Sequence, residues 1–308
     1  MKYLQLVRYQ NLLLIALMQL TLRFGFLNKQ NCPLALSNWE FILVVLATLC
    51  IAAGGYIIND VFDQGTDSIN KPEKVIVGKS ISESQAYNLY VGLTITGVTI
   101  GFGLSHVIEK PNFVVFFMLI ASVLYFYATT LKQIMLLGTV AVALVLASSV
   151  IIIGIFDVFP VTTAENQRQM APIFSLLIDY SLFAFMLNCI REIIKDIEDI
   201  DGDKKHQINT LAVQLGVSKT AKLLSVFCLI PMGLFLNYLY RYFVLNDLQW
   251  ISIYSLFFII SPLGYCAAKL FLAQNKSDFS SLSSLLKWII LFGIFLLPIL
   301  HYNIQHHA

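Results

Sequence analysis

Residues 54–72 read GGYIINDVFDQGTDSINKP, where an apolar run gives way to polar and acidic side chains. Asn59, Asp63 and Asp67 lie four residues apart in this stretch. Residues four apart share one face of an α-helix, so a helix that continues from the apolar run would carry all three side chains on one side. This face is rich in carboxylate and amide oxygens, and it is predicted to attract cations.

A second stretch with the same character, REIIKDIEDIDGD, occupies residues 191–203. Asp196, Asp199 and Asp203 are spaced there at i, i+3 and i+7, which again places them on one helical face. The two stretches are called the first and the second acidic motif below. Two acidic faces, each at the end of an apolar segment, predict a divalent metal site between them.

The composition is that of a polytopic membrane protein rather than of a soluble domain. Of the 308 residues, 58% are hydrophobic and 12% are charged, and the formal net charge is only +2. Nucleic acid is therefore not an expected partner, whereas the lipid bilayer is. The five cysteines form no CxxC pair, and they are interpreted as lipid-facing or core residues.

Apolar runs of about 20 residues, the length that spans a bilayer, predict roughly nine transmembrane helices. The first lacks a small-residue cleavage site, so a membrane helix is favoured over a signal peptide. With no large polar insertion, the sequence predicts an all-α fold and a single transmembrane domain over residues 1–308. The predicted helix cores are 10–27, 40–58, 86–107, 112–130, 134–158, 173–192, 221–243, 250–271 and 286–302.

The placement of lysine and arginine predicts the orientation of these helices. With nine spans and a cytoplasmic N-terminus, fifteen of the twenty basic residues fall on the cytoplasmic side. Both acidic motifs then lie on that side, in a multi-pass protein of the inner membrane of a bacterium. The five basic residues on the opposite side are Arg23, Lys29, Lys110, Arg168 and Arg241.

The two motifs together predict a bound diphosphate. Crowded carboxylates near a bilayer are costly unless cations compensate, and Mg²⁺ prefers oxygen ligands while retaining positions for substrate phosphates. Nearby basic side chains are expected to contact phosphate oxygens. These are Lys71, Lys74, Lys132, Arg191, Lys195 and Lys204.

A simpler interpretation treats the acidic residues as solvated charges at helix ends. A single DxxxD pattern is weak evidence for metal, and Glu192, Glu198 and Asp201 are expected to be solvated. Two clusters on the same predicted face favour metal binding for the others.

The motifs resemble those of the UbiA superfamily of intramembrane prenyltransferases. The resemblance rests on the first motif with its following NKP, on the second motif, and on YFYATTLK at 125–132, which is similar to a tyrosine-rich YxxxLK segment of the family. It implies a helical bundle around a central cavity that holds a prenyl diphosphate through Mg²⁺. Metal ligands would be Asn59, Asp63, Asp67, Asp196, Asp199 and Asp203, and Asp63, Asp67, Asp199 and Asp203 would be catalytic.

The resemblance also implies substrate-binding residues and a reaction. The substrate-binding set would be Asn59, Lys71, Tyr125, Lys132, Arg191 and Lys195. After the diphosphate leaves, a ring carbon or hydroxyl of a lipophilic acceptor would attack the allylic cation. The rings of Tyr56, Tyr125 and Tyr127 would stabilise that cation, although ordinary aromatic packing also explains them.

The sequences of the two motifs most resemble those of geranylgeranylglycerol-phosphate geranylgeranyltransferases. The alternative is an aromatic prenyltransferase of quinone biosynthesis, of the 4-hydroxybenzoate or dihydroxynaphthoate type. Departures from the family pattern at Lys74-Val75, Gln207, Ala212 and Thr139 leave the acceptor open. A secondary transporter is disfavoured, because its charged sites would lie near the bilayer midplane rather than at helix ends.

The charge asymmetry predicts the accessibility of introduced cysteines. Cysteines placed near Ser68 and near Lys205 should react with a membrane-impermeant thiol reagent from the cytoplasmic side only. A cysteine placed near Asn166 should react from the opposite side. Labelling of the Ser68 and Lys205 positions from opposite sides would contradict a shared site.

Overall fold

The protein is described by a computed structural model that covers residues 1–73 and 75–306. Within these residues it consists of helices and the loops that connect them, with an isolated bridge between Val77 and Ile81. The α-helices are α1 Lys2–Leu6, α2 Tyr9–Leu20, α3 Asn38–Phe62, α4 Gln64–Asn70, α5 Glu83–Val107, α6 Val114–Thr129, α7 Leu137–Ile153, α8 Gln167–Glu198, α9 Ile200–Lys205, α10 Leu211–Leu215, α11 Val217–Tyr238, α12 Gln249–Ser255, α13 Ser261–Leu272, α14 Lys276–Ile294 and α15 Leu296–His306.

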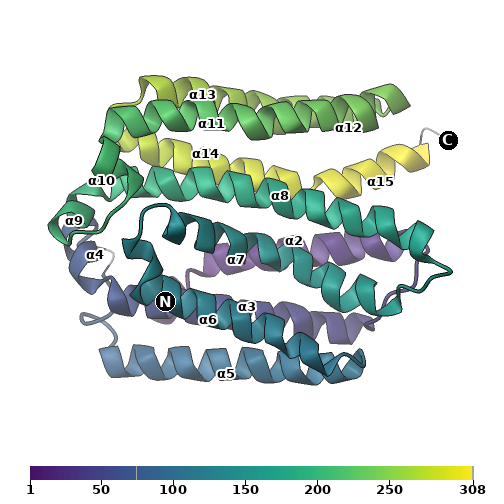
Figure 1. The fold of residues 1–308 in the computed structure, drawn as a ribbon, viewed down its shortest axis with the longest axis horizontal. Coiled ribbons are helices and arrows are strands. Elements are labelled where there is room, and N and C mark those ends of the chain that lie inside the picture. Colours follow the sequence, from purple (N-terminus) through teal and green to yellow (C-terminus); the bar gives the residue numbers. More distant parts are fainter. Residues whose placement is uncertain (74, 307–308) are drawn as a thin grey trace.

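Nine helical stretches of the described chain are long and apolar enough to cross a membrane. They are built on α2, α3, α5, α6, α7, α8, α11, α12 with α13, and α14 with α15. The predicted all-α, nine-helix membrane fold is therefore confirmed. The long helices run side by side, and the short helices α4, α9 and α10 gather at one end of the bundle (Figure 1).

Two of the long helices begin at capping boxes that the sequence encodes locally. Ser37 accepts a hydrogen bond from the Glu40 amide, and the Glu40 carboxylate accepts one from the Ser37 amide. Ser82 and Gln85 form the same reciprocal pair at the start of α5. Each box satisfies two amides that lack a partner within the helix, so the starts of α3 and α5 are well defined.

Helix α8 connects the two halves of the bundle, because its side chains enter two hydrophobic cores. Ile190 and Ile194 pack into a core shared with α11, α13 and α14. Met170 and Leu177 pack into a second core, which is built mainly on α3 and α7. The second acidic motif begins in the last two turns of α8, so this packing positions it.

A buried ion pair stabilises the end of the bundle opposite α4 and α9. Arg23 forms an ion pair with Asp157, and the two side chains are 3% and 0% exposed. Both residues lie in π-helical turns, and both also bind the backbone of Leu36: the Arg23 guanidinium donates to its carbonyl at 2.8 Å, and Asp157 Oδ1 accepts from its amide at 3.0 Å. The pair therefore attaches the segment before α3 to α2 and α7.

Removing one partner of this pair should destabilise the protein strongly, because the other charge stays buried without compensation. We expect Asp157→Ala to cost about 3–5 kcal/mol of unfolding free energy. Thermal unfolding of the purified protein in detergent would measure the loss. The double variant Arg23→Met/Asp157→Leu should recover most of it, and a single variant that melts like the wild type would contradict this role.

Candidate active site

Each acidic motif spans a break between a long and a short helix. Asp63 ends α3 and starts α4, with φ −93° and ψ 3°. Asp199 ends α8 and starts α9 with nearly the same angles, φ −101° and ψ 9°. The predicted helices therefore do not run uninterrupted through the motifs. Each break is flanked by helical backbone hydrogen bonds: the Asp63 amide donates to the Asn59 carbonyl, and the Asp67 amide donates to the Asp63 carbonyl. The Asp203 amide donates to the Asp199 carbonyl in the same way.

The short helices α4 and α9 pack against each other and bring the two motifs together. The Asn70 amide group donates to the Asp199 carbonyl at 2.9 Å and accepts from the Gly202 amide at 2.8 Å. A Cβ atom at Gly202 would lie 2.4 Å from Asn70 Nδ2, so only glycine fits this contact. A Cβ atom at Gly65 on α4 would likewise lie only 2.8 Å from the ring of His206. These contacts set the separation of the motifs.

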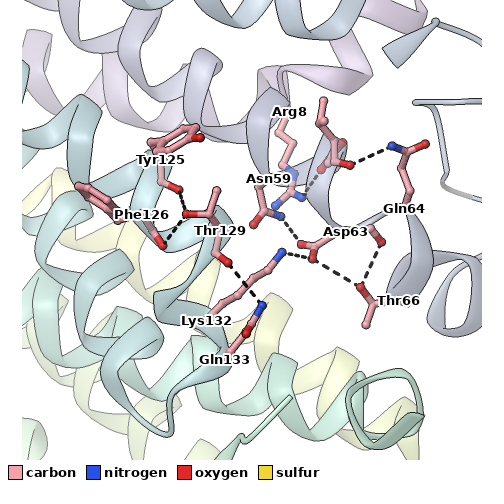
Figure 2. A network of polar contacts seen from close by, with 12 residues as sticks. Arg8, Asn59, Asp63, Gln64, Thr66, Tyr125, Phe126, Thr129, Lys132 and Gln133 are labelled. Atoms are coloured by element: carbon pink, nitrogen blue, oxygen red, sulfur yellow. Dashed lines mark hydrogen bonds and ion pairs between the residues drawn. The ribbon is translucent and has the colours of Figure 1, made fainter. Parts of the chain in front are cut away.

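Lysine side chains bind the central aspartates of both motifs (Figure 2 shows the first). Lys132, in the turn after α6, forms an ion pair with Asp63. Asp63 also accepts a hydrogen bond from the Asn59 amide group at 2.6 Å. Lys71, just after α4, contacts the Asp199 carboxylate at 2.7 Å. Each of these lysines therefore supplies positive charge next to a predicted metal ligand.

A polar cavity of about 750 Å³ lies between the motifs. All the predicted metal ligands line it, together with four of the basic residues predicted to bind phosphate: Asn59, Asp63, Asp67, Asp196, Asp199, Asp203, Lys71, Lys132, Arg191 and Lys195. Lys204 is exposed and is not among the residues described as lining the cavity, and Lys74 lies outside the described residues. The structure thus brings nearly the whole predicted site together.

Tyr125, which was predicted to bind substrate, is not among the residues described as lining the polar cavity. Its ring stacks on Tyr90 with centroids 6.4 Å apart and meets Phe62 edge to face. Tyr127, two residues later on α6, occupies the cavity wall instead. The described structure therefore supports aromatic packing for Tyr125 and a place at the site for Tyr127.

Two carboxyl groups of the polar cavity, Asp67 and Asp203, have raised pKa values. Burial, followed by the charge of Asp63, raises the pKa of Asp67 from 3.8 to about 6. Burial, followed by the charge of Asp199, raises the pKa of Asp203 from 3.8 to about 7. Because a raised carboxyl pKa means that the ionised form is disfavoured, added cations would stabilise this arrangement.

The residues of the polar cavity fit a hard divalent cation by chemistry, although their positions would have to change. Among the described residues, no three His, Cys, Asp or Glu side chains converge in a way that could hold a metal ion. Asn59 Oδ1 is buried and has no hydrogen-bond partner in the described chain, and the motifs offer only oxygen donors. Lys132 and Lys71 pair with Asp63 and Asp199 and neutralise them. A bound metal ion would supply this positive charge instead.

A second, apolar cavity of about 100 Å³ extends into the bundle between α3, α6 and α7. Ile51, Gly55, Phe117, Leu124 and Ile152 are among its lining residues. The polar and apolar cavities share part of their walls, and this shared zone is called the throat below. The residues that line both cavities, and so define the throat, are Arg8, Asn11, Asn59, Tyr127, Arg191, Glu192 and Lys195.

The sequence reasoning missed several residues of the throat and its surroundings. Arg8 adopts left-handed backbone angles, binds Asp60 at 2.8 Å and lies over the Tyr56 ring at 5.0 Å. Glu192 was expected to be solvated, and this is wrong: its side chain is 12% exposed and accepts a hydrogen bond from Lys195 at 2.5 Å. The available signal was a charged residue inside or beside an apolar run, which often marks a functional site.

Comparison with known proteins agrees with this architecture. The model of the UbiA prenyltransferase family matches residues 21–299. Digeranylgeranylglyceryl phosphate synthase of Saccharolobus solfataricus is 34% identical over 256 residues, which cover 81% of this chain and 83% of that protein. The protein of the same name from Korarchaeum cryptofilum is 30% identical over 301 residues, or 96% of each chain.

Solved structures show the same fold. A structure of digeranylgeranylglyceryl phosphate synthase superposes with a TM-score of 0.65 at 23% identity, covering 99% of this chain and 98% of that chain. A UbiA homolog from Archaeoglobus fulgidus, bound to GPP and Mg²⁺, gives a TM-score of 0.54 at 14% identity, covering 96% and 99%. The family match, the relatives and the paired motifs agree, and the chain belongs to the UbiA prenyltransferase family.

Proposed function

We propose that this prenyltransferase transfers a geranylgeranyl-type chain from its diphosphate to the hydroxyl group of a glyceryl phosphate lipid, with Mg²⁺ as cofactor. The observation that carries the proposal is that both acidic motifs face one polar cavity, which meets an apolar cavity at the throat. The relatives named digeranylgeranylglyceryl phosphate synthase support this acceptor class.

The polar cavity would hold the diphosphate. Asn59 and the five motif aspartates around it would bind Mg²⁺, and the bound metal would neutralise the leaving diphosphate. Lys71 and Lys132 already lie against Asp199 and Asp63, so they would transfer their hydrogen bonds to phosphate oxygens once metal satisfies the carboxylates. Asp63 and Asp199 are thus the central ligands of the two motifs.

The apolar cavity would take the start of the isoprenoid chain. With the diphosphate between the motifs, C1 of the chain lies at the throat, and the tail continues between α3, α6 and α7. Tyr56 and Tyr127 line this path and can present ring faces to positive charge at C1.

An anionic acceptor fits the remaining cations of the polar cavity. Arg8, Arg191, Lys195 and Lys287 line it in addition to the two lysines that bind the motifs. A phosphate group is well matched to such a cluster, since guanidinium and ammonium groups form charge-assisted hydrogen bonds to its oxygens.

The site would open on the cytoplasmic side of the membrane, within a single domain formed by residues 1–308. The excess of basic residues on that side supports this orientation. The relatives named above are mostly archaeal, so a bacterial membrane stays a prediction from sequence.

Loss of one central aspartate should abolish transfer. We expect Asp63→Asn and Asp199→Asn each to lower turnover roughly 10²-fold or more, because a ligand that stabilises the leaving group is removed. Turnover would be measured with radiolabelled geranylgeranyl diphosphate, a panel of glyceryl phosphate and aromatic acceptors, and membranes treated with or without EDTA.

The matched control for these variants is Asp201→Asn, which changes an exposed aspartate of the second motif that is not among the residues lining the polar cavity. It should keep near-wild-type turnover. Transfer that survives chelation, or wild-type turnover of either central variant, would contradict the metal assignment. A product made only from an aromatic acceptor would contradict the proposed acceptor class.

Removal of Lys132 should have a smaller effect than removal of metal. One lysine in contact with phosphate contributes about 1–2 kcal/mol, so Lys132→Gln should raise the KM for the prenyl diphosphate roughly tenfold, with a smaller fall in kcat. Lys110→Gln, an exposed lysine after α5, is the control. Unchanged KM in Lys132→Gln would show that this lysine only balances Asp63.

A further inference from the structure

The throat contains one carboxylate among its described residues. Of the seven residues that line both cavities, three are cations, three are neutral, and Glu192 is the acid. Glu192 lies one helical turn before Asp196, and it is not one of the predicted metal ligands. It lies where the reactive carbon and the acceptor would meet if the proposed function holds.

The contacts of Glu192 leave part of its carboxylate available. Oε1 accepts a hydrogen bond from Lys195 at 2.5 Å and lies 3.6 Å from Arg191 Nη1. No hydrogen-bond partner is found for Oε2 within the described chain, and the side chain borders both cavities. Lys195 and Arg191 place two positive charges beside this largely buried carboxylate, and they compensate the cost of burying its negative charge.

The proposed reaction requires a proton acceptor. When a hydroxyl oxygen attacks C1, it gains positive charge and its proton becomes strongly acidic, so even a carboxylate paired with lysine can take the proton. Asp60 is engaged by Arg8 at 2.8 Å and, as described, lines the polar cavity but not the throat. Tyr127 lines the throat, but a phenol carries its own proton at neutral pH.

We infer that Glu192 is the general base of the reaction, a role that rests on the proposed transfer to a hydroxyl group. The bond between C1 and the diphosphate oxygen breaks, and its electron pair leaves with the diphosphate. A lone pair of the acceptor oxygen forms the new C–O bond. The hydroxyl proton passes to Glu192 Oε2 and from there to water in the polar cavity.

The test is the partition between two products. Acceptor hydroxyl and water compete for the same carbon, so loss of the base should favour release of prenyl alcohol over ether. With radiolabelled geranylgeranyl diphosphate, geranylgeranylglyceryl phosphate and Mg²⁺, we expect Glu192→Gln to lower the ratio of ether to prenyl alcohol roughly 10²-fold or more. Its KM for the diphosphate should stay near the wild-type value.

Three further variants separate catalysis from structure. Glu192→Asp keeps a carboxylate and should recover part of the ratio. Glu165→Gln changes an exposed glutamate just before the same helix that is not described as lining either cavity, and it should keep the wild-type ratio. Glu192→Gln/Lys195→Met removes both charges of the ion pair and should keep the ratio low. Melting temperatures in detergent, with and without Mg²⁺, show that each variant is folded and binds metal.

The outcomes distinguish the two proposals. A wild-type ratio in Glu192→Gln, or recovery of the ratio in the double variant, would overturn the role of Glu192 and leave the proposed function standing. A wild-type enzyme that releases diphosphate in the presence of the glyceryl phosphate lipid but forms no ether would contradict the acceptor, and with it the assignment of a base for a hydroxyl group.

Discussion

The crossing of α4 and α9 is the contact on which the site depends. Asn70 on α4 reaches the backbone of α9 through two hydrogen bonds, and Gly202 leaves it the space to do so. The aspartates of the two motifs lie on either side of this crossing, and their mutual repulsion would separate the helices if nothing opposed it. Neutral hydrogen bonds from the Asn70 side chain to the backbone at Asp199 and Gly202 therefore hold together two clusters that repel each other.

Lysine side chains supply the positive charge that the two acidic motifs need. In the described structure, Lys132 and Lys71 each neutralise the central aspartate of one motif. Lysine is suited to this place because its flexible stem can move the ammonium group a few ångströms without a change in the backbone. The same two charges can thus serve the carboxylates before the substrates bind and the phosphate oxygens afterwards. The throat, between the polar and the apolar cavity, combines three cationic side chains with Glu192. In the proposed complex, the diphosphate of the prenyl donor would meet its apolar chain there.

Local patterns predicted much of this architecture. Nine apolar runs predicted nine membrane helices, and the spacing of Asn59, Asp63 and Asp67 predicted their common side, because helical periodicity depends only on nearby residues. The breaks at Asp63 and Asp199 were not predicted, since neither position carries proline or glycine. Their backbone angles accompany the packing of α4 on α9, which is a long-range contact.

Long-range packing also explains the errors at the site. The rotation of α6 against α3 and α5 decides that Tyr127 faces the cavities while Tyr125 packs on Tyr90, and the sequence of α6 is apolar on all sides. Glu192 was expected in solvent because it stands in a charged run, yet the packing of α8 against α7 and α14 turns it toward the throat.

The central claim is that the two motifs bind metal and diphosphate as one site. Calorimetric titration of Mg²⁺ into detergent-solubilised protein, with an unreactive thiolodiphosphate analogue of the prenyl donor present, tests it most directly. Wild-type protein should bind the metal, and Asp63→Asn and Asp199→Asn should each lose most of that binding, although the residues belong to different motifs. Wild-type affinity and stoichiometry in either variant would show that one motif suffices, and would contradict the shared site.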